Sequence, residues 1–390
     1  VYVGTGSDST PGAASWWQDT QLTNDLSYFY RVFAPDEVPN YSTGVDTNAI
    51  PELKNVVYVD RDALGANNGS SWANAYSNLS VALGAVTAPT KLWIAEGIYY
   101  PGTIRANTFQ LVDGVSLFGG FAGNETAIHQ RNVAGQPTIL SGDIDEDDLL
   151  DDDNSHHVVT GGDDIQLDGL TIAMGYTLDI TSHPDGDGAG LLFPADTLVS
   201  GRIDNCTFEY NSAYMRGGAI YLDYQNDGRT GLTISNSVFR YNTLRRDHSS
   251  AEGGAIYIFL DRPLTIQDSV FSDNGGGQTY NAGAIMANRA DLHLFNTTFA
   301  RNTCERLGGA IYGTQSTPVA PYEIIGCDFF ENENTALVDG GAIYVDRGHF
   351  EGNVIRDCRF YANRSIRDAG AVMLRNYRGL VEDTVFSCNT

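Results

Sequence analysis

Hydrophobic and polar positions between residues 203 and 389 recur in a fixed order. An aliphatic residue is followed five positions later by phenylalanine and three further on by asparagine, seven times in all. The motif GGAIY, or a close variant, lies between most of these lines, as at 217–221 and 253–257. A fixed period with variable spacers predicts a stacked repeat protein, in which each unit buries its apolar face against its neighbours. The recurring residues are Phe208, Phe239, Phe271, Phe299, Phe329, Phe360 and Phe386, with Asn211, Asn242, Asn274, Asn302, Asn332, Asn363 and Asn389.

Each unit carries strand and turn residues. Ile220 and Leu222 are apolar at alternate positions, which is typical of a strand with one buried face. The step of five from the aliphatic residue to phenylalanine is odd, so both side chains can point inward only if the chain bends between them. One position between them holds only Asn, Asp or Gly, the residues that tolerate left-handed geometry. Each repeat is therefore predicted to be one coil of about three strands in a parallel β-helix, with the asparagines forming a ladder from coil to coil. The bend residues are Asn205, Asn236, Asp268, Asn296, Gly326, Asp357 and Asp383.

A less regular form of the same pattern extends toward the N-terminus. Residues 167–172 and 112–117 both show the step of five around a glycine, Gly169 and Gly114. Residues 79–86 are expected to form a short amphipathic helix that caps the open end of the β-helix, and residues 91–99 a strand. We therefore expect a β-helix over 57–390. The last coil stops just past Asn389 and residue 1 is not Met, so we expect the chain to be a piece of a longer or processed protein.

Residues 1–50 lack the period. Alternation of Tyr28, Tyr30 and Val32 predicts a half-buried strand. With Leu22 six residues earlier, this stretch resembles the tyrosine corner of a fibronectin type III domain, whose neighbouring strands would lie at 1–5 and 40–46. The resemblance implies a partial β-sandwich-like spacer module, joined by a linker at 51–56.

The alternating GGAI and FxxN motifs resemble the repeats of chlamydial polymorphic outer-membrane proteins. Residues 57–145, with VYVDRDALGANNGSSWANAY and TILSGDID, resemble the entry segment of large β-helix surface adhesins of Bacteroidetes and related bacteria. Membership would imply an all-β, right-handed parallel β-helix that is secreted or displayed on the bacterial exterior.

The amino-acid composition limits the classes of partner that the chain is expected to bind. The net charge is −26, which opposes binding to nucleic acid. No run of 18 apolar residues exists, so we expect no transmembrane helix. Cys206, Cys327 and Cys358 share one repeat position. They are expected to form a small inward row, although a disulfide between Cys327 and Cys358 in adjacent coils is sterically possible.

Acidic residues supply the candidate metal ligands. Asp143, Asp145 and Asp147 present oxygen atoms at alternate positions of a loop, which suits Ca²⁺, and Asp185 and Asp187 form a second candidate. The alternative is a solvated acidic loop. A catalytic cluster would need carboxylates in matched positions of adjacent coils. The position after the GGAIY strand carries no such row.

One row of side chains is expected to point outward. Tyr221, Tyr257, Tyr312 and Tyr344, here called the tyrosine row, alternate with the inward residues. An exposed aromatic row could bind sugars or protein. The alternatives are that a loop covers the row or that stacking stabilises the strands.

These observations favour a non-catalytic extracellular β-helical protein. It would act as an adhesin or as a structural or filament component, with carbohydrate or protein partners at a cell surface or in a fibre. The alternative is a polysaccharide-active β-helix enzyme, a lyase or a glycoside hydrolase, since the fold alone does not decide.

Overall fold

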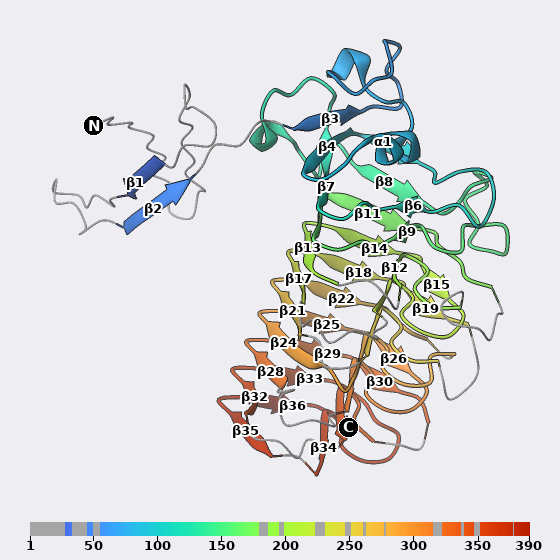
Figure 1. The fold of residues 1–390 in the computed structure, drawn as a ribbon. Helices are drawn as coiled ribbons and strands as arrows, with labels where there is room; N and C mark the ends of the chain where they lie inside the picture. The colour runs from blue at the N-terminus through green and yellow to red at the C-terminus, as the bar shows by residue number, and fades with distance from the viewer. Residues whose placement is uncertain are drawn as a thin grey trace. The chain divides into compact units, whose positions relative to one another are not determined.

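A computed structural model describes most of the chain in two compact units, Val1–Asn55 and Val56–Thr390 (Figure 1). The described residues are 28–32, 45–49, 55–178, 186–194, 199–222, 231–245, 251–259, 263–276, 278–314, 322–336, 339–346, 352–376 and 378–390. In the first unit, β1 (Tyr28–Val32) pairs antiparallel with β2 (Val45–Ala49). The strand expected at Tyr28 is present, and β2 overlaps the strand expected at 40–46, of which residues 40–44 lie outside the described part. The fibronectin type III assignment stays a prediction, and Leu22 and residues 1–5 lie outside the described part.

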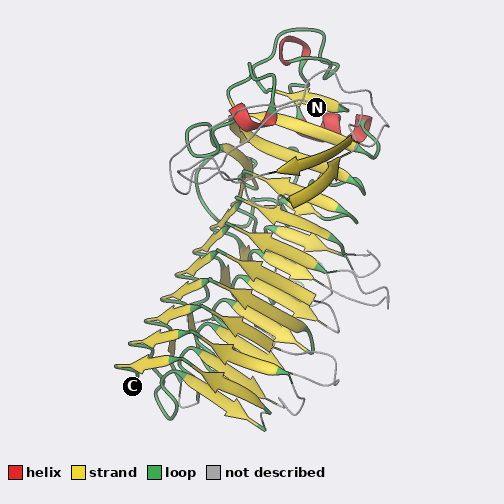
Figure 2. Cartoon of the chain, turned by 90° about the vertical axis from the view of Figure 1, so that its left-hand side faces the viewer, coloured by secondary structure: helices red, strands yellow, loops and turns green. Residues whose placement is uncertain are grey.

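The second unit is a parallel β-helix, as predicted. Three long parallel sheets run along it, and strands of successive coils lie one above another (Figure 2). The first sheet contains β3 (Val56–Val59), β4 (Thr90–Ala95), β7 (Val115–Phe121), β10 (Ile165–Asp168), β13 (Gly201–Asp204), β17 (Leu232–Ser235), β21 (Pro263–Gln267), β24 (Asp291–Phe295), β28 (Tyr322–Ile325), β32 (Asn353–Arg356) and β35 (Gly379–Glu382).

The other two long sheets complete each coil. The second contains β5 (Gly97–Tyr99), β8 (Thr138–Ser141), β11 (Leu170–Ala173), β14 (Thr207–Glu209), β18 (Val238–Arg240), β22 (Val270–Ser272), β25 (Thr298–Ala300), β29 (Asp328–Phe330), β33 (Arg359–Tyr361) and β36 (Val385–Ser387). The third contains β6 (Phe109–Gln110), β9 (Val159–Thr160), β12 (Leu191–Phe193), β16 (Ile220–Leu222), β20 (Ile256–Phe259), β23 (Ile285–Asn288), β27 (Ile311–Thr314), β31 (Ile343–Asp346) and β34 (Val372–Arg375). Two short parallel pairs, β15 (Ser212–Ala213) with β19 (Thr243–Leu244) and β26 (Thr303–Cys304) with β30 (Glu333–Asn334), extend some turns.

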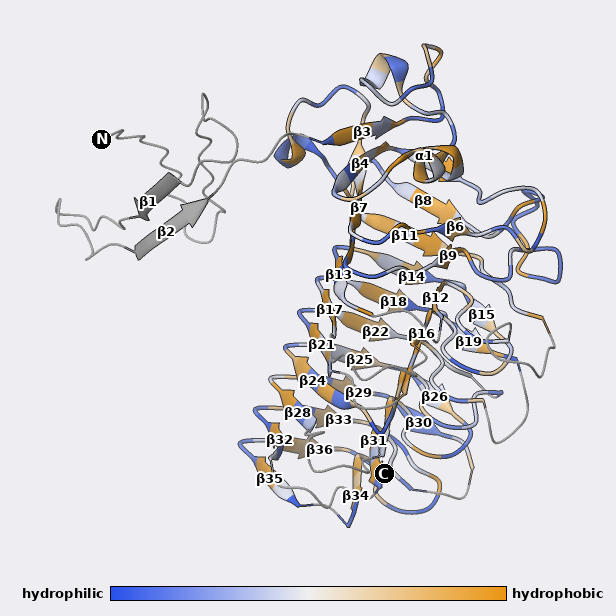
Figure 3. Cartoon of the chain, in the orientation of Figure 1, coloured by the Kyte–Doolittle hydropathy of each residue, from blue (hydrophilic) through white to orange (hydrophobic). Residues whose placement is uncertain are grey.

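The core is the dry interior of the coils. Aliphatic side chains from all three sheets and the phenylalanines fill it, and apolar colour follows the strands (Figure 3). From Phe208 to Phe386, rings in adjacent coils stack with centroids 4.5–5.0 Å apart. This spacing matches the separation of neighbouring strands, so each ring packs on the ring of the next coil.

The asparagines form a hydrogen-bonded ladder beside this stack. Asn274 illustrates the unit: its Oδ1 accepts from the backbone N and from Nδ2 of Asn242, at 3.1 and 2.9 Å. Its own Nδ2 donates to the carbonyl of Phe239 at 2.8 Å and to Oδ1 of Asn302 at 3.0 Å. The buried amide is thereby satisfied on both sides, as a buried polar group requires.

Several acid–arginine pairs join adjacent coils on the outside. Glu209 binds Arg240 at 2.6 Å and Asp273 binds Arg301 at 2.7 Å. Asp328 and Arg359, and Glu333 and Arg364, are paired in the same way. In each pair the acid lies on the earlier coil and the arginine on the next.

The first coil is capped as expected. Helix α1 (Leu79–Ala85) begins at Asn78, whose side chain accepts from the backbone N of Val81 at 3.0 Å, and buries Leu79, Ala82 and Leu83. It lies at the N-terminal end of the β-helix, near β3 and β6 (Figure 1). Two one-turn 3₁₀ helices, η1 (Trp72–Asn74) and η2 (Ile128–Gln130), occur in nearby loops.

Two upstream predictions were wrong. Residues 91–99 form two strands in different sheets, β4 and β5, because the chain turns at Glu96 and Gly97, where Gly97 has φ of 135°. Leu117 pairs with Leu167 in the first sheet, so residues 112–117 do not contain the step between sheets. The matching step at 167–172 is present, since Leu167 pairs with Ile203 and Ile172 with Phe208.

Candidate functional site

The acidic loop, residues 143–153, follows β8 and brings three predicted ligands together. Carboxylate oxygens of Asp143, Asp145 and Asp147 lie within 4.8 Å of one another. Asp143 is buried and organises the loop, because its carboxylate accepts from the backbone N of Asp147 at 3.3 Å and of Asp148 at 3.1 Å. Asp145 and Asp147 are exposed. Three carboxylates form a hard oxygen donor set that fits Ca²⁺, with the rest of its six to eight ligands left to other oxygen atoms.

Like charges raise proton affinity within this loop. Desolvation, followed by the charge of Asp147, raises the pKa of Asp145. A side-chain hydrogen bond that the protonated Asp153 donates to Asp151 raises the pKa of Asp153 to about 6. A bound cation would lower both pKa values, because it replaces the proton as the compensating charge.

The second calcium candidate is not assembled in the described residues. Asp185 lies outside the described part of the chain. Asp187 is fully buried beside the third sheet, away from the acidic loop. Its backbone forms a parallel β-bridge with that of Arg216 in the next coil. Asp187 is therefore better explained by its neighbours in the next coils than by an ion site.

Those neighbours form a charge column that the sequence analysis missed. Asp187, Arg216, Glu252 and Asn281 occupy the same position in successive coils, linked by parallel bridges. Nδ2 of Asn281 donates to Oε1 of Glu252 at 2.9 Å. Burial raises the pKa of Glu252, against the opposing effects of Asn281 and Arg216. The signal in the sequence is the polar residue directly before the motifs that begin at 217, 253 and 282.

The expectation of an exposed tyrosine row was wrong. Tyr221, Tyr257 and Tyr344 are only 1%, 3% and 5% exposed, and Tyr312 is partly buried. The row faces away from the core but packs among Leu192, Met286 and Phe259. The rings of Tyr221 and Tyr257 stack at 5.5 Å. The alternative that the row is covered and stabilises the strands therefore fits the structure.

Polar contacts hold the tyrosine row against the charge column. The guanidinium of Arg216 lies 5.1 Å from the ring centroid of Tyr257, and Nδ2 of Asn288 donates to the Tyr257 hydroxyl at 3.0 Å. Burial raises the pKa of Tyr257 to about 12, so the phenol stays protonated at neutral pH. This region is a packed second layer rather than an open aromatic surface.

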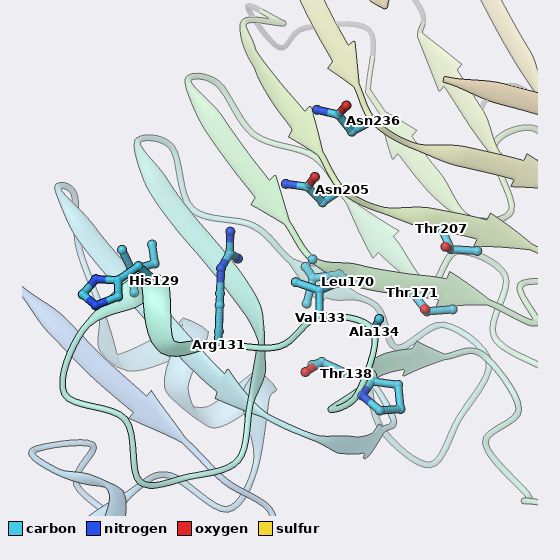
Figure 4. A pocket seen from close by; sticks show the side chains of 13 residues that line it. His129, Arg131, Val133, Ala134, Thr138, Leu170, Thr171, Asn205, Thr207 and Asn236 are labelled. Atoms are coloured by element: carbon cyan, nitrogen blue, oxygen red, sulfur yellow. The ribbon is translucent and has the colours of Figure 1, made fainter. Parts of the chain in front are cut away.

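A hollow at one corner of the β-helix has a volume of about 650 Å³ (Figure 4). It lies where the first and second sheets meet, beneath the loop 122–137 that joins β7 to β8. We call it the corner groove. Its lining residues are Ile128, His129, Arg131, Val133, Ala134, Pro137, Thr138, Gly169, Leu170, Thr171, Asn205, Thr207 and Asn236. The sequence analysis named Asn205, Asn236 and Gly169 only as bend residues.

The cysteines are free thiols in this structure. Cys206, Cys327 and Cys358 face inward and are buried, as the expected small row requires. A hydrogen bond between Cys327 and Cys358 raises the pKa of Cys327 and lowers that of Cys358. The two thiols are therefore neighbours in adjacent coils, without a disulfide bond.

Comparisons with known proteins agree with the architecture. A family model described as the right-handed β-helix region matches residues 186–348. The chain is 30% identical over 191 residues to the probable autotransporter YfaL of Escherichia coli (strain K12), a stretch that is 44% of this chain and 14% of that protein. No solved structure matches the chain significantly. No helix in the described residues has the length and hydropathy needed to cross a bilayer. The stacked sheets and the family match together make residues 56–390 a right-handed parallel β-helix.

Proposed function

We propose that this chain is a non-catalytic part of an extracellular β-helical protein, acting as an adhesin or as a structural component of a surface. The similarity to a probable autotransporter supports an extracellular location. The partners that fit are carbohydrate or protein at a cell surface. The net charge of −26 opposes nucleic acid as a partner.

The observation that carries this proposal is the uninterrupted axial stacking. The phenylalanine stack and the asparagine ladder continue through seven successive coils without a gap. A solenoid with one contact pattern in every coil resists bending and presents a long surface. Such rigidity suits a protein that holds a binding surface at a distance.

The carboxylates of the charge column and of the acidic loop fit a structural role better than a catalytic one. Asp187 and Glu252 lie two coils apart with Arg216 between them, and the charge of Arg216 opposes the burial that raises the pKa of Glu252. Asp143, Asp145 and Asp147 lie on a loop that suits a cation. A glycoside hydrolase or lyase needs an accessible acid and base on opposite sides of a sugar bond.

A binding assay and a depolymerisation assay on the same samples test the proposal. Wells are coated with neutral polysaccharides, acidic polysaccharides or extracellular-matrix proteins, and retention of the full chain is compared with that of serum albumin. We expect saturable retention on at least one coating, with no new reducing ends and no unsaturated uronate absorbance.

Turnover of any polysaccharide by the purified chain would overturn the non-catalytic assignment in favour of an enzyme. Absence of retention on every coating, under conditions where the chain remains folded, would contradict adhesion.

A further inference from the structure

The corner groove has a preformed wall. The loop 122–137 is fixed at its base, because Nη2 of Arg131 binds Oδ2 of Asp168 at 2.6 Å with both side chains mostly buried. The backbone N of Asn132 donates to the carbonyl of Gly120 at 2.7 Å. Val133 packs onto Gly169, where a β-carbon would approach its Cγ2 to 2.7 Å. Glycine at this bend, where most other coils have Asn or Asp, therefore lets the wall close onto the β-helix.

The floor carries polar groups without internal partners. Thr171 and Thr207 are direct neighbours in β11 and β14, and both are partly exposed. Within the described residues, neither hydroxyl makes a hydrogen bond, and nor does the side-chain amide of Asn236. Asn205 donates from Nδ2 to Asp168 at 2.9 Å, which leaves its Oδ1 available. Donors and acceptors thus repeat from one coil to the next along the groove (Figure 4).

The remaining lining is mostly apolar and includes two basic side chains, His129 and Arg131. Ile128, Val133, Pro137 and Leu170 supply hydrocarbon surface. No carboxylate lines the groove, and the charge of Arg131 is compensated by Asp168. A ligand for this site should therefore present hydroxyl groups at regular intervals together with apolar faces, and should carry no strong charge.

We propose that the corner groove binds neutral pyranose units of a carbohydrate chain that runs along the β-helix axis. Thr171, Thr207 and the amides of Asn205 and Asn236 bind sugar hydroxyls, while Val133 and Leu170 contact the C–H faces of the rings. This assignment rests on the proposed adhesive function and gives it a location and a ligand class.

A peptide fits the groove less well. An extended peptide binds by adding to an open sheet edge, but the strands of the floor, β8, β11 and β14, are each paired on both sides. An amphipathic helix needs a continuous apolar channel, whereas hydroxyl and amide groups interrupt this one. An acidic chain would meet the overall negative charge of the protein without an uncompensated arginine to hold it.

Oligosaccharide binding to matched variants tests the inference. The probes are hexasaccharides of β-1,4-linked glucose, mannose and xylose, with hexagalacturonate as the anionic probe, followed by saturation-transfer NMR and calorimetry. Thr171→Val/Thr207→Val removes both hydroxyls and keeps β-branched side chains, and Thr207→Tyr fills the groove. Thr298→Val and Thr298→Tyr change the same strand position in β25, outside the groove.

We expect at least one neutral hexasaccharide to bind. Loss of two hydrogen bonds should weaken it about tenfold in Thr171→Val/Thr207→Val. Thr207→Tyr should abolish binding, and both Thr298 variants should bind as the unaltered chain does. Thermal unfolding confirms that each variant is folded.

Other outcomes overturn the inference. These are binding of hexagalacturonate alone, no binding of any neutral probe, or unchanged binding in Thr207→Tyr. Retention of Thr207→Tyr on polysaccharide-coated wells would reject the groove as the site while leaving adhesion intact. If the unaltered chain is not retained on any coated well, adhesion itself is rejected.

Discussion

At the scale of single residues, two bends in every coil shape the chain. The first was predicted: Asn205, Asn236, Asp268, Asn296, Gly326, Asp357 and Asp383 all have φ between 47° and 66°. The second, directly before each ladder asparagine, was not predicted, although φ there is 52–57° at Tyr210, Tyr241, Asp273, Arg301, Glu331, Ala362 and Cys388. Apart from Asp273, these residue types carry no turn signal. The ladder asparagine of the next coil bonds to the backbone on both sides of the bend, as Asn242 does around Tyr210 by accepting from the N of Asn211 and donating to the carbonyl of Phe208. Sequence periodicity does not reveal that constraint.

Removing one ladder amide should destabilise the chain strongly. Asn274→Ala removes four hydrogen bonds. Their other members are the backbone N and Nδ2 of Asn242, the carbonyl of Phe239 and Oδ1 of Asn302. Each buried unsatisfied group costs about 1–3 kcal/mol, so we expect the free energy of unfolding to fall by about 3 kcal/mol or more. Urea denaturation followed by circular dichroism measures it.

Asn389→Ala is the matched control, because Asn389 lies in the last coil and is partly exposed. The loss of unfolding free energy in Asn389→Ala should be clearly smaller than in Asn274→Ala. Equal losses in the two variants would mean that the ladder does not act through buried hydrogen bonds.

At the scale of elements, the sequence located strands through alternation and bends but not the packing outside them. The tyrosine row was placed on the correct face, yet its burial depends on segments distant in sequence, such as those carrying Arg216 and Met286. The split between β4 and β5 was missed because residues 91–99 read as one apolar run. The corner groove depends on how the loop 122–137 folds back, which no local pattern records.

The acidic loop is the element whose chemistry is most directly testable. We expect millimolar Ca²⁺ to raise the unfolding temperature at pH 7.5, because a ligand that binds only the folded state stabilises it. The raised pKa values of Asp145 and Asp153, the latter about 6, mean that protons are held more tightly in the folded chain than in the unfolded chain. Protons therefore compete with Ca²⁺, and the effect should diminish as pH falls through about 6.

Asp145→Asn/Asp147→Asn should abolish the calcium effect. Asp357→Asn/Asp383→Asn removes two exposed acids from bends in distant coils and should leave it unchanged. Calcium stabilisation that survives in the first variant, or is absent in the unaltered chain, would leave a solvated acidic loop as the correct interpretation.

At the scale of the whole β-helix, each coil contacts mainly the coils next to it. Stability in such an array is approximately a sum of unit and nearest-neighbour terms. Damage at one coil should therefore remain local instead of lowering stability uniformly.

Hydrogen exchange measured by mass spectrometry can detect this locality. In Asn274→Ala, amides of β18, β22 and β25 should exchange faster, while those of β7, β10 and β11 should keep their rates. The unaltered chain and Asn389→Ala provide the references. Uniform acceleration from β7 to β36 would show a single cooperative unit and contradict nearest-neighbour stabilisation.

The coil-to-coil ion pairs have a consequence for how such an array can lengthen or shorten. Glu209–Arg240, Asp273–Arg301 and Asp328–Arg359 each tie two coils into a doublet, acid first and arginine second. Excising one coil of a doublet leaves one of these charges without its partner, whereas excising both leaves the other two of these three pairs intact. Gene duplications or deletions that add or remove two coils at a time should therefore leave fewer of these charges unpaired than those that add or remove one.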